Sequence, residues 1–283
     1  MRFGRWSALI VAPLLFGCET PAAPVLIVGA ERFLPPPVYQ LWWEMTVQCS
    51  GRRAPLPRVR WYFVPGARTV EFEGERYAGY WYSTGNSIVL AEEAMLDGSL
   101  VRHEMLHSLI QAGSHHREEF LGRCGGVVLC DERCIADADP LPPADPAVAR
   151  VGPDALEVDV AVSPQAPSRL QHGGYFTMTV TARNPNDHPV VVTLPPSGDA
   201  EPPVTFAYQA EHAGGFTGLG DRAWDDGVTR FAPGETKRRV FDFHIVGPDE
   251  STLGGGLRPG TYDLRGAYGN RWAPATTITL SSP

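Results

Sequence analysis

The chain has 283 residues, enough for two domains and long for one hydrophobic core. Its hydrophobic fraction of 43% and charged fraction of 20% are those of an ordinary globular protein. The net charge of −8, with no basic stripe along the chain, argues against a nucleic acid as partner.

Residues 1–18 have the pattern of a secretory signal peptide. A basic start at Arg2 and Arg5 precedes an apolar run over residues 8–16, which is too short to span a bilayer. The run ends in a Leu-Phe-Gly-Cys sequence that resembles a bacterial lipobox and closes at Cys18. The resemblance implies cleavage before this cysteine and lipid on its sulfur and amine, whereas the alternative is a plain signal peptide. We therefore expect an exported protein of the bacterial cell envelope, anchored to a membrane at its periplasmic or outer-membrane face.

Proline-rich stretches divide the rest of the chain. Residues 19–37 contain five prolines and little periodicity, which predicts a tether. A second proline-rich stretch, residues 139–154, predicts a stiff linker between two domains. The expected domains are therefore residues 38–138 and 155–283.

The first of these domains opens with a predicted helix. Apolar residues recur at three- and four-residue steps from Val38 to Cys49, and Ser50-Gly51 ends the pattern. Alternating and β-branched residues then predict three strands. They span Val59–Phe63, Tyr77–Tyr82 and Ser87–Leu90.

A second helix follows these strands. It starts near Asp97 or Ser99, either of which could cap it, and runs to about Ala112. Gly113 is expected to take the left-handed conformation after its last turn. The predicted order in this domain is helix, three strands, helix.

After the linker, seven short strands with turn residues between them predict an immunoglobulin-like β-sandwich. They span Leu156–Ser163, Tyr175–Arg183, Val190–Leu194, Val204–Gln209, Arg239–Val246, Thr261–Tyr268 and Thr276–Leu280. The segments Thr179–Pro185, Phe231–Glu235 and Leu257–Tyr262 resemble bacterial intracellular proteinase-inhibitor-like domains. This resemblance implies a fold more than an inhibitory activity.

The four cysteines that remain after Cys18 predict two disulfides, because an even number in an exported protein is typical of disulfide pairing. We favour a long-range Cys49–Cys124 bond with Cys130–Cys134 closing a small loop. The alternative is a metal cluster of cysteine and histidine, which the lack of a Cys-x-x-Cys spacing disfavours.

The predicted second helix carries His103-Glu104-Met105-Leu106-His107, the His-Glu-x-x-His motif of zinc peptidases. Residues four apart lie one turn above each other, so both imidazoles face one point and suit Zn²⁺ as ligands. Glu104 can reach a zinc-activated water without ligating the metal and act as general base for attack on a peptide carbonyl. The alternative is a helix with two solvated or packed histidines.

The third metal ligand is less well defined by the sequence. His115 is the favoured candidate because a turn at Gly113-Ser114 can fold it back toward the helix. His116 is its rival, and Glu118 and Glu119 follow. An oxyanion stabiliser is also expected, and the sequence does not choose among Tyr80, Tyr82 and His116.

The helix–strands–helix order with its motif resembles the upper half of a zincin metallopeptidase over residues 38–138. The resemblance implies His103 and His107 as ligands and Glu104 as general base. The chain departs from the metzincin pattern, since Ile110 and Gly113 stand where a glycine and a histidine are required. Segments around residues 101–107 and 115–124 also resemble bacterial lipoproteins of metallopeptidase type.

The expected fold is therefore a minimal α+β zincin-like domain followed by an immunoglobulin-like β-sandwich. The leading functional hypothesis is a zinc peptidase of the cell envelope, with a peptide or protein substrate that the sequence does not identify. The alternative is a non-catalytic binding lipoprotein that uses its sandwich domain and has a structural or vestigial zinc site. A third hypothesis makes the second domain an inhibitor that covers the cleft of the first.

Overall fold

The computed structural model describes residues 28–130, 134, 147–164, 173–194, 204–213, 215–222, 228–247, 252 and 255–281. The predicted signal peptide and Cys18 lie outside the described residues, as do positions 19–27 of the predicted tether and 139–146 of the predicted linker. Within the described ranges, no helix is long and apolar enough to cross a membrane.

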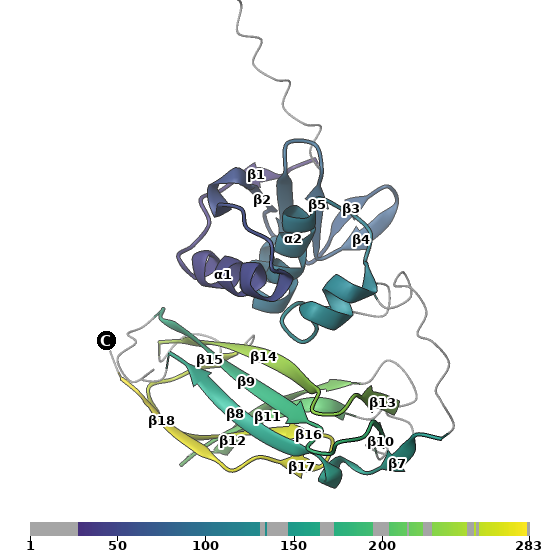
Figure 1. The fold of residues 1–283 in the computed structure, drawn as a ribbon. Helices are drawn as coiled ribbons and strands as arrows, with labels where there is room; N and C mark the ends of the chain where they lie inside the picture. Colours follow the sequence, from purple (N-terminus) through teal and green to yellow (C-terminus); the bar gives the residue numbers. More distant parts are fainter. Residues whose placement is uncertain are drawn as a thin grey trace, which may run out of the picture.

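The N-terminal part, residues 28–130, lies above the C-terminal part, residues 147–281, in Figure 1. Its elements are, in chain order, β1 (Glu31–Arg32), α1 (Val38–Ser50), η1 (Leu56–Arg58), β2 (Arg60–Val64), β3 (Val70–Phe72), β4 (Glu75–Tyr77), β5 (Gly79–Tyr82), β6 (Ser87–Ala91), η2 (Glu92–Ala94), α2 (Gly98–Ile110) and η3 (Glu118–Arg123). Four strands form one sheet in the order β1-β2-β6-β5, while β3 and β4 form a separate hairpin. Strand β5 lies at the end of this sheet and pairs antiparallel with β6.

Both helices have clear local causes for their ends. Helix α1 follows Pro37 and stops at Gly51, which has φ +67° and donates its N–H to the Val47 carbonyl. Helix α2 is capped by Asp97, whose carboxylate accepts the backbone N–H groups of Ser99 and Leu100, both at 3.1 Å. The left-handed residue after α2 is Gln111 with φ +55°, so the prediction that Gly113 takes this position is wrong.

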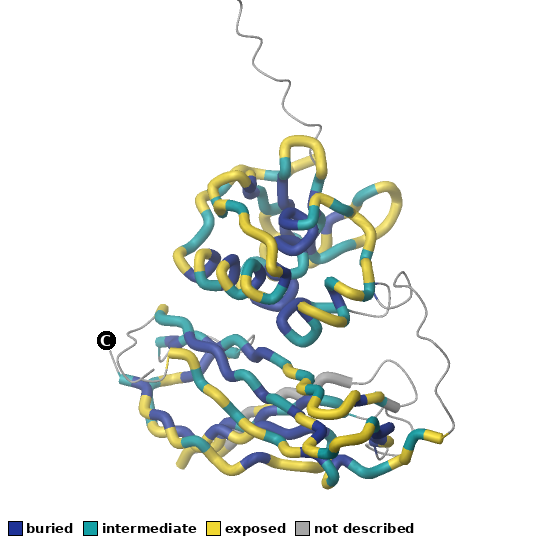
Figure 2. The backbone as a smooth tube through the Cα atoms, in the orientation of Figure 1, coloured by how far each residue is buried: buried dark blue, intermediate teal, exposed yellow. Residues whose placement is uncertain are grey.

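The core of the N-terminal part lies between the two helices and the sheet. Its buried side chains are mainly aromatic and aliphatic. They include Tyr39, Trp42, Trp43, Trp61, Trp81, Ile88, Leu90, Val101 and Met105. Figure 2 shows α2 as one of the more completely buried segments of this part, so the helix with the motif is held from several sides.

The two favoured disulfides are both present. Cys49 in the last turn of α1 is bonded to Cys124 just after η3, and Cys130 is bonded to Cys134. The predicted pairing is therefore confirmed, and the alternative of a metal cluster that uses these cysteines is wrong.

The C-terminal part is built from strands. They are β7 (Ala149–Val151), β8 (Glu157–Ser163), β9 (Tyr175–Arg183), β10 (Val190–Thr193), β11 (Val204–His212), β12 (Gly215–Arg222), β13 (Val228–Phe231), β14 (Thr236–Ile245), β15 (Gly256–Leu257), β16 (Gly260–Tyr268), β17 (Arg271–Trp272) and β18 (Thr276–Leu280), with the short turn η4 (Pro153–Ala155) after β7. The sheets have the orders β13-β10-β7, β12-β11-β16-β17 and β15-β14-β9-β8, and β18 pairs with β16. The last residues of the predicted linker thus form β7 and η4, and β7 pairs with β10.

The predicted fold class, a minimal zincin-like domain followed by an immunoglobulin-like sandwich, is wrong. The described residues form mostly strands in several sheets, and the N-terminal part contains six strands where three were predicted. The prediction missed β1 and β3, and it did not separate β4 from β5 within Tyr77–Tyr82. Such short strands are set by their pairing partners and carry little periodicity of their own. In the C-terminal part β7, β10 and β13 form a sheet of their own, which a sandwich of two sheets does not contain.

Candidate metal centre

Three histidine side chains meet at one point between α2 and the segment that follows it. The Nε2 atoms of His103 and His107 lie 3.1 Å apart, as expected for residues one helical turn apart. The Nε2 atom of His115 lies 3.2 Å from each of them. The structure thus brings the three predicted ligand residues together. We call His103, His107 and His115 the metal-compatible group, because their ligand atoms all lie within 4.8 Å of one another.

Backbone carbonyls orient two of these imidazoles. His103 Nδ1 contacts the Leu129 carbonyl oxygen, and His107 Nδ1 lies 2.7 Å from the Ala112 carbonyl oxygen. A carbonyl only accepts, so each neutral imidazole carries its proton on Nδ1 and leaves Nε2 as a lone pair. The two facing Nε2 atoms then have no proton to share, and a cation between them would replace lone-pair repulsion with two bonds.

The spacing of the three nitrogens fits zinc. Three ligands at about 2.0–2.1 Å in a tetrahedral arrangement lie roughly 3.3 Å from one another. The distances of 3.1 to 3.2 Å between the Nε2 atoms are close to this value. The chemistry of the donor set agrees, because neutral imidazole is a common zinc ligand and its second nitrogen normally donates to an oxygen.

Burial keeps the two helix histidines neutral. Loss of solvent lowers the pKa of His103 to about 4, and the nearby His115 contributes to the shift. Burial also strongly lowers the pKa of His107, with a further contribution from His103. Both imidazoles are therefore unprotonated at neutral pH, which is the state that binds a metal.

Glu104 is buried on the same helix and lines the same pocket as the three histidines. Burial raises the pKa of Glu104 to about 8, partly opposed by a hydrogen bond from the Trp81 backbone. A divalent cation nearby would favour the carboxylate and lower this pKa again. Glu104 thus shares the pocket with the three histidines, while its carboxylate is not a member of the metal-compatible group.

The pocket has a volume of about 510 Å³ and a mixed lining. One wall is strand β5 with Gly79, Tyr80 and Trp81, and the other is the metal-compatible group with Glu104. Trp81 is stacked on His107 with a ring separation of 6.2 Å. Phe120 of η3 lies behind the histidines, with ring-centre distances of 4.8 to 5.0 Å to all three imidazoles.

The rival candidates for the third ligand lie elsewhere. His116 is exposed and forms a hydrogen bond with the Ser114 hydroxyl. Glu118 pairs with Arg123, and Glu119 lies 4.0 Å from Arg52. Among the described residues, His115 is therefore the candidate that joins His103 and His107.

The two tyrosines considered as oxyanion stabilisers, Tyr80 and Tyr82, differ in whether they line the pocket. Tyr80 lines the pocket, and burial raises its pKa with smaller contributions from neighbours that include Glu104. Tyr82 is not part of the pocket lining. Both tyrosines pack against Phe72, with ring centres 4.1 Å away for Tyr80 and 5.0 Å away for Tyr82. Of the two tyrosines, Tyr80 is the one that lines the pocket.

Several residues at this centre had no sequence signal. The carbonyls of Ala112 and Leu129 act through the backbone, and Phe120 is one aromatic residue among many. Arg102 is different, because a charged residue on the apolar side of a helix implies a buried partner. The partner itself, described below, comes from the other half of the chain.

No protein-family model matches the chain, and no curated protein matches it either. Solved structures resemble parts of the chain with low TM-scores and low sequence identity. An alkylpurine DNA glycosylase AlkC of Pseudomonas fluorescens bound to DNA containing an abasic site analog is 10% identical, with a TM-score of 0.30 over 45% of this chain and 30% of that one. A mutant beta-glucosidase of Listeria innocua in complex with laminaribiose is 12% identical, with a TM-score of 0.26 over 45% of this chain and 16% of that one.

The putative ApaA protein of Bordetella pertussis is 16% identical, with a TM-score of 0.25 over 48% of this chain and 98% of that one. The chain thus spans less than a third of the length of the first two structures it matches. At these TM-scores the similarities carry no argument about function, which has to be derived from the site itself.

Proposed function

We propose that the chain is a zinc-dependent hydrolase of peptides or proteins that acts in the bacterial cell envelope. The observation that carries the proposal is the meeting of three imidazole nitrogens beside a buried carboxylate in one pocket. Such a site supports a reaction class, whereas the surrounding fold does not.

The residues present fit zinc, which His103, His107 and His115 would hold through Nε2. Bound there, zinc would supply Lewis acidity that polarises a substrate carbonyl and makes a water more acidic. Glu104 would accept the proton of the attacking water and pass it to the leaving amine. The Trp81 backbone donates a hydrogen bond to this carboxylate. Tyr80, which lines the pocket, would be the candidate donor to the developing oxyanion.

The number of ligands favours an enzyme over a structural zinc site. Structural sites use four protein ligands, whereas catalytic sites use three and leave a position for water or substrate. In the part of the chain that the structure describes, the group contains three members, and none is a cysteine. The alternative of a non-catalytic binding lipoprotein with a structural zinc therefore has less support.

The strand beside the pocket favours a peptide as substrate. Strand β5 is the last strand of its sheet, and Gly79 to Trp81 line the pocket. An extended peptide could add to this edge by backbone hydrogen bonds and so bring a carbonyl to the histidines. Glycine at position 79 lets β5 lie close to Glu104, because a Cβ there would be only 2.9 Å from Leu90 Cδ2 and 3.2 Å from Glu104 Cγ.

The location in the cell envelope and the lipid on Cys18 are part of the same proposal. They depend on the sequence of residues 1–18 and on its resemblance to a lipobox. The two disulfides are consistent with an oxidising compartment.

The first test measures the zinc content of the purified protein without residues 1–18, beside a His103→Ala/His107→Ala variant. We expect about one zinc per chain, lost in the variant. A peptide library would then be digested by the wild type, by Glu104→Gln and by Glu118→Gln. Removal of the general base should lower the rate by about 10²–10⁴-fold, whereas Glu118 is exposed and paired with Arg123, so its variant should keep wild-type activity.

Two results would refute the proposal. Folded protein that takes up no zinc even after reconstitution would remove the metal from the mechanism. Cleavage by Glu104→Gln at the wild-type rate would show that this carboxylate is not the base.

A further inference from the structure

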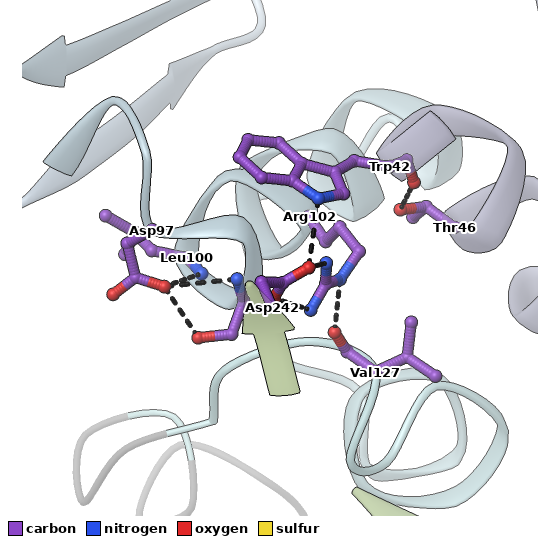
Figure 3. Close-up of polar contacts among 8 residues, drawn as sticks. Trp42, Thr46, Asp97, Leu100, Arg102, Val127 and Asp242 are labelled. Carbon is purple, nitrogen blue, oxygen red and sulfur yellow. Dashed lines mark hydrogen bonds and ion pairs between the residues drawn. The ribbon is translucent and has the colours of Figure 1, made fainter. Parts of the chain in front are cut away.

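The residue before the first histidine of the motif is buried and charged. The side chain of Arg102 on α2 has 0% exposure, and the next residue along the helix is His103. Figure 3 shows its guanidinium surrounded by oxygen acceptors. Arg102 Nε donates to the Val127 carbonyl at 2.6 Å, and its two terminal nitrogens donate to Asp242 at 2.8 and 2.9 Å.

Asp242 belongs to β14 of the C-terminal part, 140 residues away from its partner. Its Oδ1 also accepts the indole N–H of Trp42 on α1 at 3.0 Å. The carboxylate packs against the start of α2, since a Cβ at Gly98 would lie 2.6 Å from Asp242 Cγ. One carboxylate of the C-terminal part thus contacts both helices of the N-terminal part (Figure 3).

The segment from Gly126 to Leu129 extends this link to the metal centre. Val240 N–H of β14 donates to the Gly126 carbonyl at 2.8 Å. The approach is close, because a Cβ at Gly126 would overlap the Arg238 carbonyl oxygen. Further along the same segment, Val127 accepts from Arg102 and Leu129 accepts from His103 Nδ1.

Two routes therefore connect β14 to His103. One runs from Asp242 through the buried Arg102 on the same helix, and the other runs from Val240 through the segment with the Leu129 carbonyl. Hydrogen bonds join β14 to Arg102 and to Gly126, and Leu129 to His103. The remaining steps run along the backbone of α2 and of residues 126–129. A metal ligand is oriented by the partner of its second nitrogen, which here is the Leu129 carbonyl. Arg102 holds the same segment through the Val127 carbonyl, so Asp242 is linked to the imidazole through Arg102 and this segment.

We propose that Asp242 is a positioning residue for the metal centre, and that the C-terminal part is a structural component of this site. The inference rests on the proposed function only in taking the three histidines to bind zinc. It makes the C-terminal part a support for the helix with the motif, which differs from a module that presents substrate or covers the cleft. Loss of the Arg102–Asp242 pair should then weaken zinc binding while the chain stays folded.

The test compares zinc affinity and the visible spectrum of the Co²⁺-loaded full chain among variants. Asp242→Asn keeps an acceptor for Trp42 but leaves the Arg102 charge buried without its partner, which can prevent folding. The second variant, Arg102→Met/Asp242→Asn, removes both charges and so avoids this penalty. The control is Ile278→Val, which trims a buried side chain on β18, in the core of the C-terminal part.

Each variant is first shown to be folded by circular dichroism, and its zinc affinity is then measured by competition with a chelating dye. We expect the double variant to bind zinc about 10–100-fold more weakly than wild type, because outer partners of metal ligands have effects of this size. The Co²⁺ bands should also change, since they report ligand geometry. The control should keep wild-type affinity and spectrum, because a loss of stability alone does not reorient His103.

The outcomes separate the two proposals. Wild-type affinity and an unchanged Co²⁺ spectrum in the folded double variant would overturn the positioning role and leave the proposed function intact. A wild-type chain that binds metal but hydrolyses no peptide would overturn the proposed function alone. A wild-type chain that binds neither Zn²⁺ nor Co²⁺ would overturn both.

Discussion

Removal of the Cys49–Cys124 disulfide should destabilise the chain much more than removal of Cys130–Cys134. The first bond joins residues 75 positions apart, and the second joins residues 4 positions apart. A cross-link lowers the entropy of the unfolded chain, and the effect grows with the length of the closed loop. With these separations the chain-entropy relation gives about 4.5 kcal/mol for the first bond and about 1.9 kcal/mol for the second at 25 °C.

The assay is urea unfolding of the Cys49→Ala/Cys124→Ala and Cys130→Ala/Cys134→Ala variants, followed by tryptophan fluorescence. The signal is suitable because Trp42, Trp43, Trp61 and Trp81 are buried in the core of the N-terminal part. Each pair has one fully buried cysteine, Cys124 and Cys134, and one partly buried. The packing losses on substitution by alanine are therefore similar, and the difference between the two variants isolates the loop term.

We expect the free energies of unfolding of the two variants to differ by about 2.6 kcal/mol, in favour of the variant that keeps Cys49–Cys124. This difference corresponds to roughly an 80-fold change in the unfolding equilibrium constant. Equal losses, or a larger loss for Cys130–Cys134, would refute the loop-entropy reasoning. Contacts around the sulfur atoms would then have to explain the stabilisation.

Two further predictions concern the metal centre. His115→Ala should weaken zinc binding strongly in a competition titration, whereas His116→Ala should leave it unchanged, because His116 is exposed and bonded to Ser114; equal effects would contradict the ligand assignment. The metal-free protein should lose about 2 kcal/mol of stability between pH 6.5 and 8, because burial raises the folded-state pKa of Glu104 to about 8 and the unfolded chain releases this proton first. The lowered pKa of His103 acts in the opposite sense but below about pH 6.5. Urea midpoints of wild type and Glu104→Gln in a chelator test this, and an equal decrease in the variant would exclude Glu104 as the cause.

Local signals in the sequence were sufficient for the parts of the site that lie within one element. His103 and His107 meet because the α-helix places residues four apart on one face, whatever surrounds the helix. Asp97 caps that helix through its own carboxylate, which is also a local effect. Strands β9 and β18 have the predicted bounds because long alternation and flanking turns define them.

The sheet arrangement was not available from the same signals. Short strands such as β3, β7 and β13 exist because a partner strand satisfies their backbone groups, so their own residues show no pattern. The predicted fold class was wrong for this reason. The turn after α2 was also misplaced, since Gln111 takes the left-handed conformation that was expected of a glycine.

What the sequence determined by itself is a helix with two histidines and a glutamate. It favoured one pairing of the cysteines, which the structure then confirmed. The tertiary structure decided which later residue completes the centre, because His115 and His116 are neighbours with opposite surroundings. It also decided what orients His103. The Leu129 carbonyl and the Asp242 carboxylate come from distant segments of the chain, and only folding brings them to the helix. The reason is that a buried arginine such as Arg102 needs acceptors, and the sequence does not show which segment provides them.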